Sequence, residues 1–245
     1  MVSTTTFLFA ALAAVVSAAP GCAPPVTFTL PKIGGGTELV APAANLVLKK
    51  IAIGHGIQNY TCGTTTDDAK ATGAVAVLYD ATGLYPGTKK TGLKQREWDS
   101  APSTLLWHSP LPLNKLVGSK YGADLANPFP DPAADLSCPG LPAAKYMGHH
   151  FFDSQGTPVF ELPAVGLAAV VGKVDGITAP ASADKGIIDT GAVAWLQLDD
   201  NLSGKSKGVT SVYRVVTAGG AAQPCSVAGA GVQSVPYATY YWFFG

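Results

Sequence analysis

The chain has 245 residues, of which 13% are charged, and its 16 basic residues balance its 16 acidic ones. This balance leaves no basic surface of the kind that binds nucleic acid or an acidic membrane, so we expect neither partner. The 28 glycines and 19 prolines favour many turns and few long helices.

Residues 1–18 have the pattern of a secretory signal peptide. The apolar run Phe7–Val16 is followed by Ser17-Ala18, which completes a small-residue cleavage site. The run is too short to span a bilayer. We therefore expect cleavage after Ala18 and a secreted, extracellular protein without a membrane anchor. Residues 19–245 read as a single β domain, because no linker or repeat divides them.

The first part of this domain contains several short runs with strand composition. Leu46–Ile53 and Ile57–Cys62 flank Gly54-His55-Gly56, which predicts a β-hairpin around a tight turn. The other two predicted strands are Val26–Leu30 and Gly73–Tyr79.

Residues 81–148 form a long, proline-rich stretch that predicts an irregular insertion. Leu105–Trp107 is its best strand candidate, and Asn127–Pro132 is too rich in proline to be helical. An irregular stretch of this length in a compact domain is usually functional or packed on the surface.

Strand patterns return after the insertion, and the last one is the strongest. Tyr237–Phe244 is almost continuously aromatic, which predicts a strand buried on both faces with Trp242 in the core, as we also expect for Trp195. The total of about ten short strands predicts an all-β fold, an antiparallel β-sandwich or barrel. The remaining predicted strands are His149–Phe152, Pro158–Leu162, Leu167–Val174, Ala192–Leu198 and Val209–Thr217.

The cysteines and two sequons fit an exported protein. After cleavage four cysteines remain, an even number that favours disulfides with three possible connectivities, and their spacing matches no zinc pattern. Asn59-Tyr60-Thr61 and Asn201-Leu202-Ser203 predict N-glycans at Asn59 and Asn201 on the surface. The four cysteines are Cys22, Cys62, Cys138 and Cys225.

Three segments carry a family resemblance: Gly56–Cys62, Ala194–Leu198, and the C-terminal pair YRVVTAGG and VPYATYYWF. From about Pro42 onward the chain resembles the secreted family known as domain of unknown function 3455, found in fungi and bacteria, whose fungal members are often labelled malate dehydrogenase. Bacterial relatives keep cysteines at the positions of Cys62 and Cys225. The resemblance therefore implies a Cys62–Cys225 bridge, which leaves Cys22–Cys138 as the second.

The residues argue against a genuine NAD-dependent malate dehydrogenase. Such an enzyme holds its cofactor with a strand, a GxGxxG turn and a helix N-terminus. The glycine run Gly34-Gly35-Gly36 lacks this spacing, and no helix pattern follows it. We therefore expect no nucleotide cofactor.

A polar group around His149-His150 is the best candidate for chemistry. Neighbouring strand residues point to opposite faces, so at most one of these histidines joins a given site. The resemblance favours His150, which with Asp153 and Glu161 forms the candidate catalytic set. The alternative is that these are ordinary surface or loop residues.

A metal site would need three or four ligands, and the candidates are His55, His108 and His150 with a carboxylate. Against this, His55 reads as a turn residue and His108 as a loop residue. Metal-dependent hydrolysis or oxidation through His150 is thus an alternative function.

Trp98 and Trp107 lie in the insertion, where exposed rings would stack on sugars. Our leading hypothesis is therefore a secreted β-protein that binds a carbohydrate, such as a wall polysaccharide, or another extracellular ligand through residues 81–152. A structural wall component without a small ligand is a further alternative.

Overall fold

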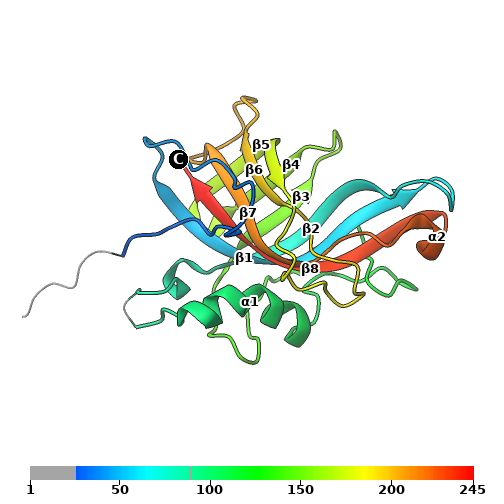
Figure 1. Cartoon of the computed structure of the whole chain (residues 1–245), viewed down its shortest axis with the longest axis horizontal. Helices are drawn as coiled ribbons and strands as arrows, with labels where there is room; N and C mark the ends of the chain where they lie inside the picture. The colour runs from blue at the N-terminus through cyan, green and yellow to red at the C-terminus, as the bar shows by residue number, and fades with distance from the viewer. Residues whose placement is uncertain (1–25, 89) are drawn as a thin grey trace, which may run out of the picture.

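The fold is a closed barrel of eight antiparallel strands in sequence order (Figure 1). It is seen in a computed structural model that describes residues 26–88 and 90–245. Each strand pairs with the next, and β8 pairs with β1 to close the barrel. The strands are β1 (Leu48–Cys62), β2 (Lys70–Asp80), β3 (Tyr146–Phe152), β4 (Pro158–Leu162), β5 (Leu167–Ile177), β6 (Trp195–Asp200), β7 (Ser211–Gly219) and β8 (Gly231–Phe244).

The predicted all-β class is confirmed, and of the two architectures the barrel is the one found. Eight strands take the place of about ten for three reasons. Val26–Leu30 forms no strand, Leu46–Ile53 and Ile57–Cys62 merge into β1, and Leu105–Trp107 is helical. The predicted signal peptide at residues 1–18 lies outside the described residues. The short helices are η1 (Thr82–Leu84), η2 (Pro163–Val165) and α2 (Cys225–Ala228).

The predicted hairpin around Gly54-His55-Gly56 is wrong, because β1 runs through these residues without a turn. A Cβ at Gly56 would lie 2.0 Å from the carbonyl oxygen of Val75, and one at Gly54 would lie 2.9 Å from the ring of Tyr241. The glycines are therefore needed because neighbouring strands approach β1 closely at these positions. In sequence, glycines used in this way look the same as glycines in a tight turn.

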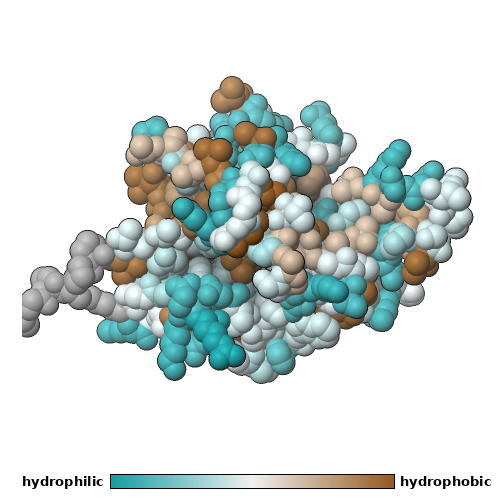
Figure 2. Space-filling model, in the orientation of Figure 1, coloured by the Kyte–Doolittle hydropathy of each residue, from teal (hydrophilic) through white to brown (hydrophobic). Residues whose placement is uncertain are grey.

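The insertion contains a helix, α1 (Gln95–His108), where Leu105–Trp107 had predicted a strand. Trp98, Ala101 and Leu105 are spaced to share one helical face, and all three are buried. The helix lies across the outside of the barrel and contacts β1, β7 and β8 (Figure 1). This packing holds a helix that carries Pro102 in its interior. Hydrophilic and hydrophobic residues are mixed over the face of the molecule seen in Figure 2.

Strand β8 is buried on both faces, as its aromatic sequence predicted. Tyr241 and Phe243 join the cluster inside the barrel, with Phe160 of β4. Tyr240 and Trp242 alternate with them and join the outer cluster beneath α1. The core therefore has two layers, one inside the barrel and one between the barrel wall and the insertion.

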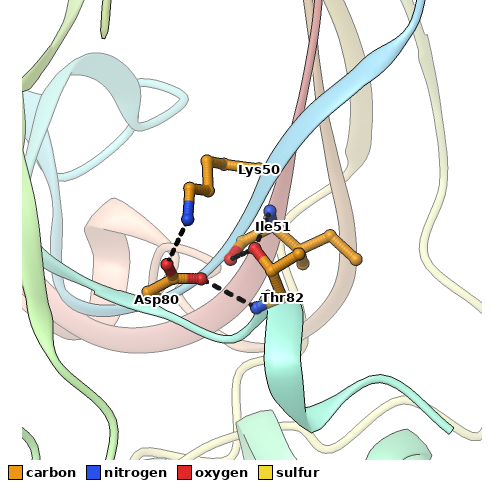
Figure 3. A network of polar contacts seen from close by, with 4 residues as sticks. All are labelled: Lys50, Ile51, Asp80 and Thr82. Carbon is orange, nitrogen blue, oxygen red and sulfur yellow. Dashed lines mark hydrogen bonds and ion pairs between the residues drawn. The ribbon is translucent and has the colours of Figure 1, made fainter. Parts of the chain in front are cut away.

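A polar network fixes the point where the insertion leaves β2 (Figure 3). Lys50 Nζ donates to Asp80 Oδ2 at 2.6 Å, and the Thr82 amide donates to Asp80 Oδ1 at 2.9 Å. The Ile51 amide donates to Thr82 Oγ1 at 3.0 Å, which ties η1 back to β1. Burial raises the pKa of Asp80, but the hydrogen bonds from Lys50 and Thr82 outweigh it and leave the pKa below its usual range.

The Cys62–Cys225 disulfide is present and joins the end of β1 to α2, 163 residues apart in sequence. In Figure 1 the long strands β1, β2 and β8 extend together towards α2, so the bridge fastens their shared end. Cys138 is buried, and its predicted partner Cys22 lies outside the described residues, so the second bridge stays a prediction. Among the described residues no helix has the length and apolar character needed to cross a bilayer.

Candidate ligand-binding site in the barrel

The inside of the barrel is filled at one end and hollow at the other. Aromatic rings of Phe160, Tyr241 and Phe243 fill the closed end. The hollow end is a cavity of about 800 Å³, which we call the barrel cup. Its lining contains two cationic residues, Lys173 and Arg214, and no acidic residue. This volume is in the range of cavities that hold one small organic ligand.

Arg214 on β7 is the central polar residue of the barrel cup. Its Nε and Nη2 groups donate to the carbonyl oxygen of Ala194 at 3.1 and 2.9 Å, and Nη1 reaches Gln58 Oε1 at 3.5 Å. These bonds use three of the five N–H groups that a guanidinium offers. No carboxylate among the described residues lies within ion-pair distance of Arg214. A fixed positive charge thus lines the cavity without a counter-charge from the residues that the structure describes.

Gln58 and Tyr60 of β1 are held in place beside this charge. Gln58 Nε2 donates to the Gly73 carbonyl at 2.7 Å, which turns Oε1 towards Arg214. The Tyr60 hydroxyl donates to the Gly220 carbonyl at 2.7 Å, linking the wall of the barrel cup to the loop after β7. Burial raises the pKa of Tyr60 to about 12, and the charge of Arg214 acts in the opposite direction. Tyr60 is therefore neutral over the physiological range.

Tyrosine hydroxyls form a further polar layer inside the barrel. The Tyr237 and Tyr241 hydroxyls are hydrogen-bonded to each other at 2.8 Å. Burial raises the pKa of Tyr241, while the charge of Arg214 opposes this effect. The layer is neutral, so it adds hydrogen-bonding groups without cancelling the charge of Arg214.

The three candidate catalytic residues are not brought together. His150 points into the barrel, 3% exposed, where its Nδ1 contacts the Val159 carbonyl at 2.9 Å and its ring stacks on Phe160. Glu161 is exposed on the outer face, opposite His149 in register. Asp153 accepts two backbone hydrogen bonds, from Gln155 and Thr157, and shapes the β3–β4 turn.

The two neighbouring histidines point to opposite faces, as strand alternation predicted. His149 lies outside the barrel and stacks on Phe129, with ring centroids 3.6 Å apart. Burial lowers the pKa of both His149 and His150 to about 4. For His150 the charge of Arg214 adds to this effect, whereas the hydrogen bond to the Val159 carbonyl opposes it. Both rings are neutral at pH 7.

The candidate metal ligands are also dispersed. His55 is buried on the outer face of β1, His108 is exposed at the end of α1, and His150 lies inside the barrel. In the ranges 26–88 and 90–245, no three His, Cys, Asp or Glu side chains form a group that could hold a metal ion. The geometry gives no support to a metal centre at these histidines.

The two candidate ligand-binding tryptophans, Trp98 and Trp107, differ in their exposure to solvent. Trp98 is 1% exposed and stacks on Tyr240, with ring centroids 4.1 Å apart, so it offers no face to a ligand. Trp107 is 53% exposed, and its Nε1 donates to Asp184 Oδ2 at 2.7 Å. Trp195 and Trp242 are buried in the core, as predicted.

The asparagines of the two sequons also differ in their exposure to solvent. Asn201 is exposed in the turn after β6, as predicted, and it lines the rim of the barrel cup. The expected surface position of Asn59 is wrong, because it is 8% exposed near the C-terminal end of β1 and accepts a hydrogen bond from Ser234.

Residues 42–245 match the model of a family described as "Protein of unknown function (DUF3455)". The chain belongs to this family. The predicted resemblance is confirmed, and the match covers the whole barrel together with the insertion that carries α1. No curated protein and no solved structure matches the chain significantly.

Sequence reasoning missed the polar centre of this DUF3455 barrel. Arg214 is one of two arginines in the chain and interrupts the apolar run Val212–Val215 at an inward position. A lone charge on the inward face of a predicted buried strand is the signal that would have identified it. Gln58 is likewise a polar residue on the inward face of a buried strand. The incorrectly predicted hairpin meant that its orientation could not be inferred.

Proposed function

We propose that this DUF3455 protein is a secreted binding protein that holds a small acidic saccharide in the barrel cup. The observation that carries the proposal is the guanidinium of Arg214, which lines a cavity of about 800 Å³ and has no carboxylate partner among the described residues. A guanidinium fork matches the geometry of a carboxylate, and the partly enclosed site strengthens the attraction.

The distribution of polar groups favours a saccharide over a hydrocarbon chain. Gln58 and Arg214 offer hydrogen bonds at the inner wall, while Lys173 and Asn201 offer them at the rim. Polar groups at several heights suit a ligand with many hydroxyls. Apolar wall residues such as Leu198 can then pack against the C–H faces of a sugar ring.

The fold supports a binding role over dinucleotide chemistry. Every strand pair within the described ranges is antiparallel, whereas dinucleotide sites are built from parallel βαβ units. Gly34–Gly36 forms a bend rather than a phosphate-binding turn before a helix. Closed barrels of eight strands have room for one small ligand, and this comparison is an analogy at the level of the fold.

The test is calorimetric titration of the secreted protein with D-galacturonate and digalacturonate, with D-galactose as the neutral analogue. We expect the acids to bind and galactose to bind weakly. Replacing Arg214 by Gln should raise the dissociation constant roughly ten- to a hundredfold, because a hydrogen bond to a charged group contributes about 1.5–3 kcal/mol.

Arg96→Gln is the matched control, since Arg96 is the chain's other arginine and is exposed on α1. It should leave binding unchanged. Equal binding of galactose and galacturonate, or full binding by a folded Arg214→Gln variant, would contradict the assignment. Absence of binding to any of the three sugars at millimolar concentration would favour the structural wall component instead.

A further inference from the structure

A second cavity lies outside the barrel wall, between β1 and the insertion. It has a volume of about 370 Å³ and is separate from the barrel cup. Its walls come from three parts of the chain: His55 and Pro236 on the barrel, the end of α1 with Trp107, and the loop that follows. We call it the outer cavity.

His55 is the unusual residue of the outer cavity. Its side chain is 1% exposed, and neither ring nitrogen has a hydrogen-bond partner among the described residues. A buried polar group without a partner is costly, and most such groups in proteins are satisfied. Because His55 lines the cavity, a molecule in that space is the available partner.

Burial lowers the pKa of His55 to about 4, so its ring is neutral at pH 7. A neutral imidazole offers one donor and one acceptor, which together match a hydroxyl group. A carboxylate would be a poor partner there, because burying it beside a neutral ring leaves its charge uncompensated. The inner end of the cavity therefore favours a hydroxyl.

Away from His55 the wall of the cavity is apolar, and its outer edge is cationic. Leu106, Leu111 and Leu113 contribute apolar wall, and Trp107 adds an aromatic surface. Lys115 and Lys120 are exposed at the edge, and the lining contains no acidic residue. Lys120 Nζ lies 5.0 Å from the ring centroid of Tyr121, which places this cation at the cavity wall.

We propose that the outer cavity binds a small hydroxylated aromatic carboxylate. Its hydroxyl bonds the ring of His55, its aromatic ring packs against the leucines and Trp107, and its carboxylate lies between Lys115 and Lys120. A rigid ring fits a cavity of this size at a small cost in conformational freedom. This site is independent of the barrel cup and of the ligand proposed there.

The test uses 4-hydroxyphenylacetate as the probe and the full secreted chain carrying Arg214→Gln, so that an acid cannot use the barrel cup. Titration is followed by calorimetry. Phenylacetate lacks the hydroxyl, and 4-ethylphenol lacks the carboxylate. We expect 4-hydroxyphenylacetate to bind at least tenfold more tightly than either analogue.

In the same background, His55→Leu and Lys120→Gln should each weaken binding at least tenfold. Lys94→Gln, which changes an exposed lysine before α1, should not. Equal affinities for the probe and phenylacetate, unchanged binding by His55→Leu, or no binding at millimolar probe would overturn the proposal. In the last case a buried water is the partner of His55.

A second measurement keeps the test sharp if His55→Leu fails to fold. The ring nitrogens of His55 are followed by NMR in ¹⁵N-histidine-labelled protein. Addition of 4-hydroxyphenylacetate should shift the His55 resonances, and phenylacetate should not. Identical spectra with both compounds would refute a hydrogen bond between the probe and His55.

Discussion

Lowering the pH from 7 to 4 should destabilise this barrel, because His55 and His150 are buried as neutral rings. Burial lowers the pKa of each from 6.5 to about 4. Between these values the unfolded chain binds protons that the folded chain does not, so stability falls as the pH falls. The loss begins near pH 6.5 and is nearly complete at the folded pKa.

The magnitude follows from the size of the shift. For one histidine with these two pKa values, linkage gives a loss of about 3 kcal/mol at pH 4 relative to pH 7. His55 and His150 acting independently would lose about 6 kcal/mol, which is comparable to the whole stability of many domains. His149, which is only half-buried but whose pKa burial also lowers to about 4, adds a further loss in the same direction. Lys115 and Lys120, which line the outer cavity with His55, carry charges of the same sign as a protonated ring.

The assay is urea unfolding followed by tryptophan fluorescence at pH 7, 6, 5 and 4. His55→Leu should reduce the pH-dependent loss by about 3 kcal/mol, because it removes one of the buried histidines that titrate in this range. His108→Leu is the matched control, since His108 is exposed at the end of α1. Parallel pH profiles for His55→Leu and the unmodified chain would refute the burial of a neutral ring at His55.

Three further predictions concern stability. Cys225→Ala should lower the melting temperature and the secreted yield, because the bridge closes a loop of 163 residues and chain entropy assigns it about 5 kcal/mol; an unchanged melting temperature would be incompatible with this role. Gly56→Ala should cost about 3 kcal/mol in urea unfolding, because its Cβ would lie 2.0 Å from a backbone oxygen, whereas Gly172→Ala in β5 has open space and should change stability by less than about 0.5 kcal/mol. Trp98→Ala should cost about 3–5 kcal/mol by emptying the space beneath α1, and a smaller loss would mean that the helix repacks.

Strands could be predicted from the sequence where their own side chains are enough to show how they are buried. Tyr237–Phe244 is a clear example, because its aromatic residues can be buried only between two layers, and β8 has both. The pairing of Cys62 with Cys225 was also predicted, and it came from the family resemblance. Neither result required knowledge of how distant strands meet.

The errors came from residues whose role depends on a distant neighbour. Gly56 looks like a turn residue until Val75 of β2 is placed against it. The α1 face of Trp98, Ala101 and Leu105 has helical spacing, but Pro102 within it and the surrounding prolines favoured irregular structure. In both cases tertiary packing overrode the local signal.

The candidate site was missed for a related reason. The predicted hairpin reversed the chain at His55. The sequence therefore did not determine whether the side chains of His55 and Gln58 lie on the same face of the sheet or on opposite faces. In the continuous strand the two residues are three apart and point to opposite faces. One strand therefore separates the two cavities, with Gln58 lining the barrel cup and His55 lining the outer cavity.

This arrangement constrains how β1 can change. A shift of one residue in its pairing with β2 and β8 would place His55 inside the barrel and Gln58 outside, and would also move Gly54 and Gly56 away from their close contacts. Gly54 and Gly56, which maintain the strand register, therefore also keep His55 and Gln58 each directed towards its own cavity. A Gly56→Ala protein that remains folded should consequently lose ligand affinity in both cavities together, whereas His55→Leu and Arg214→Gln should each affect only one.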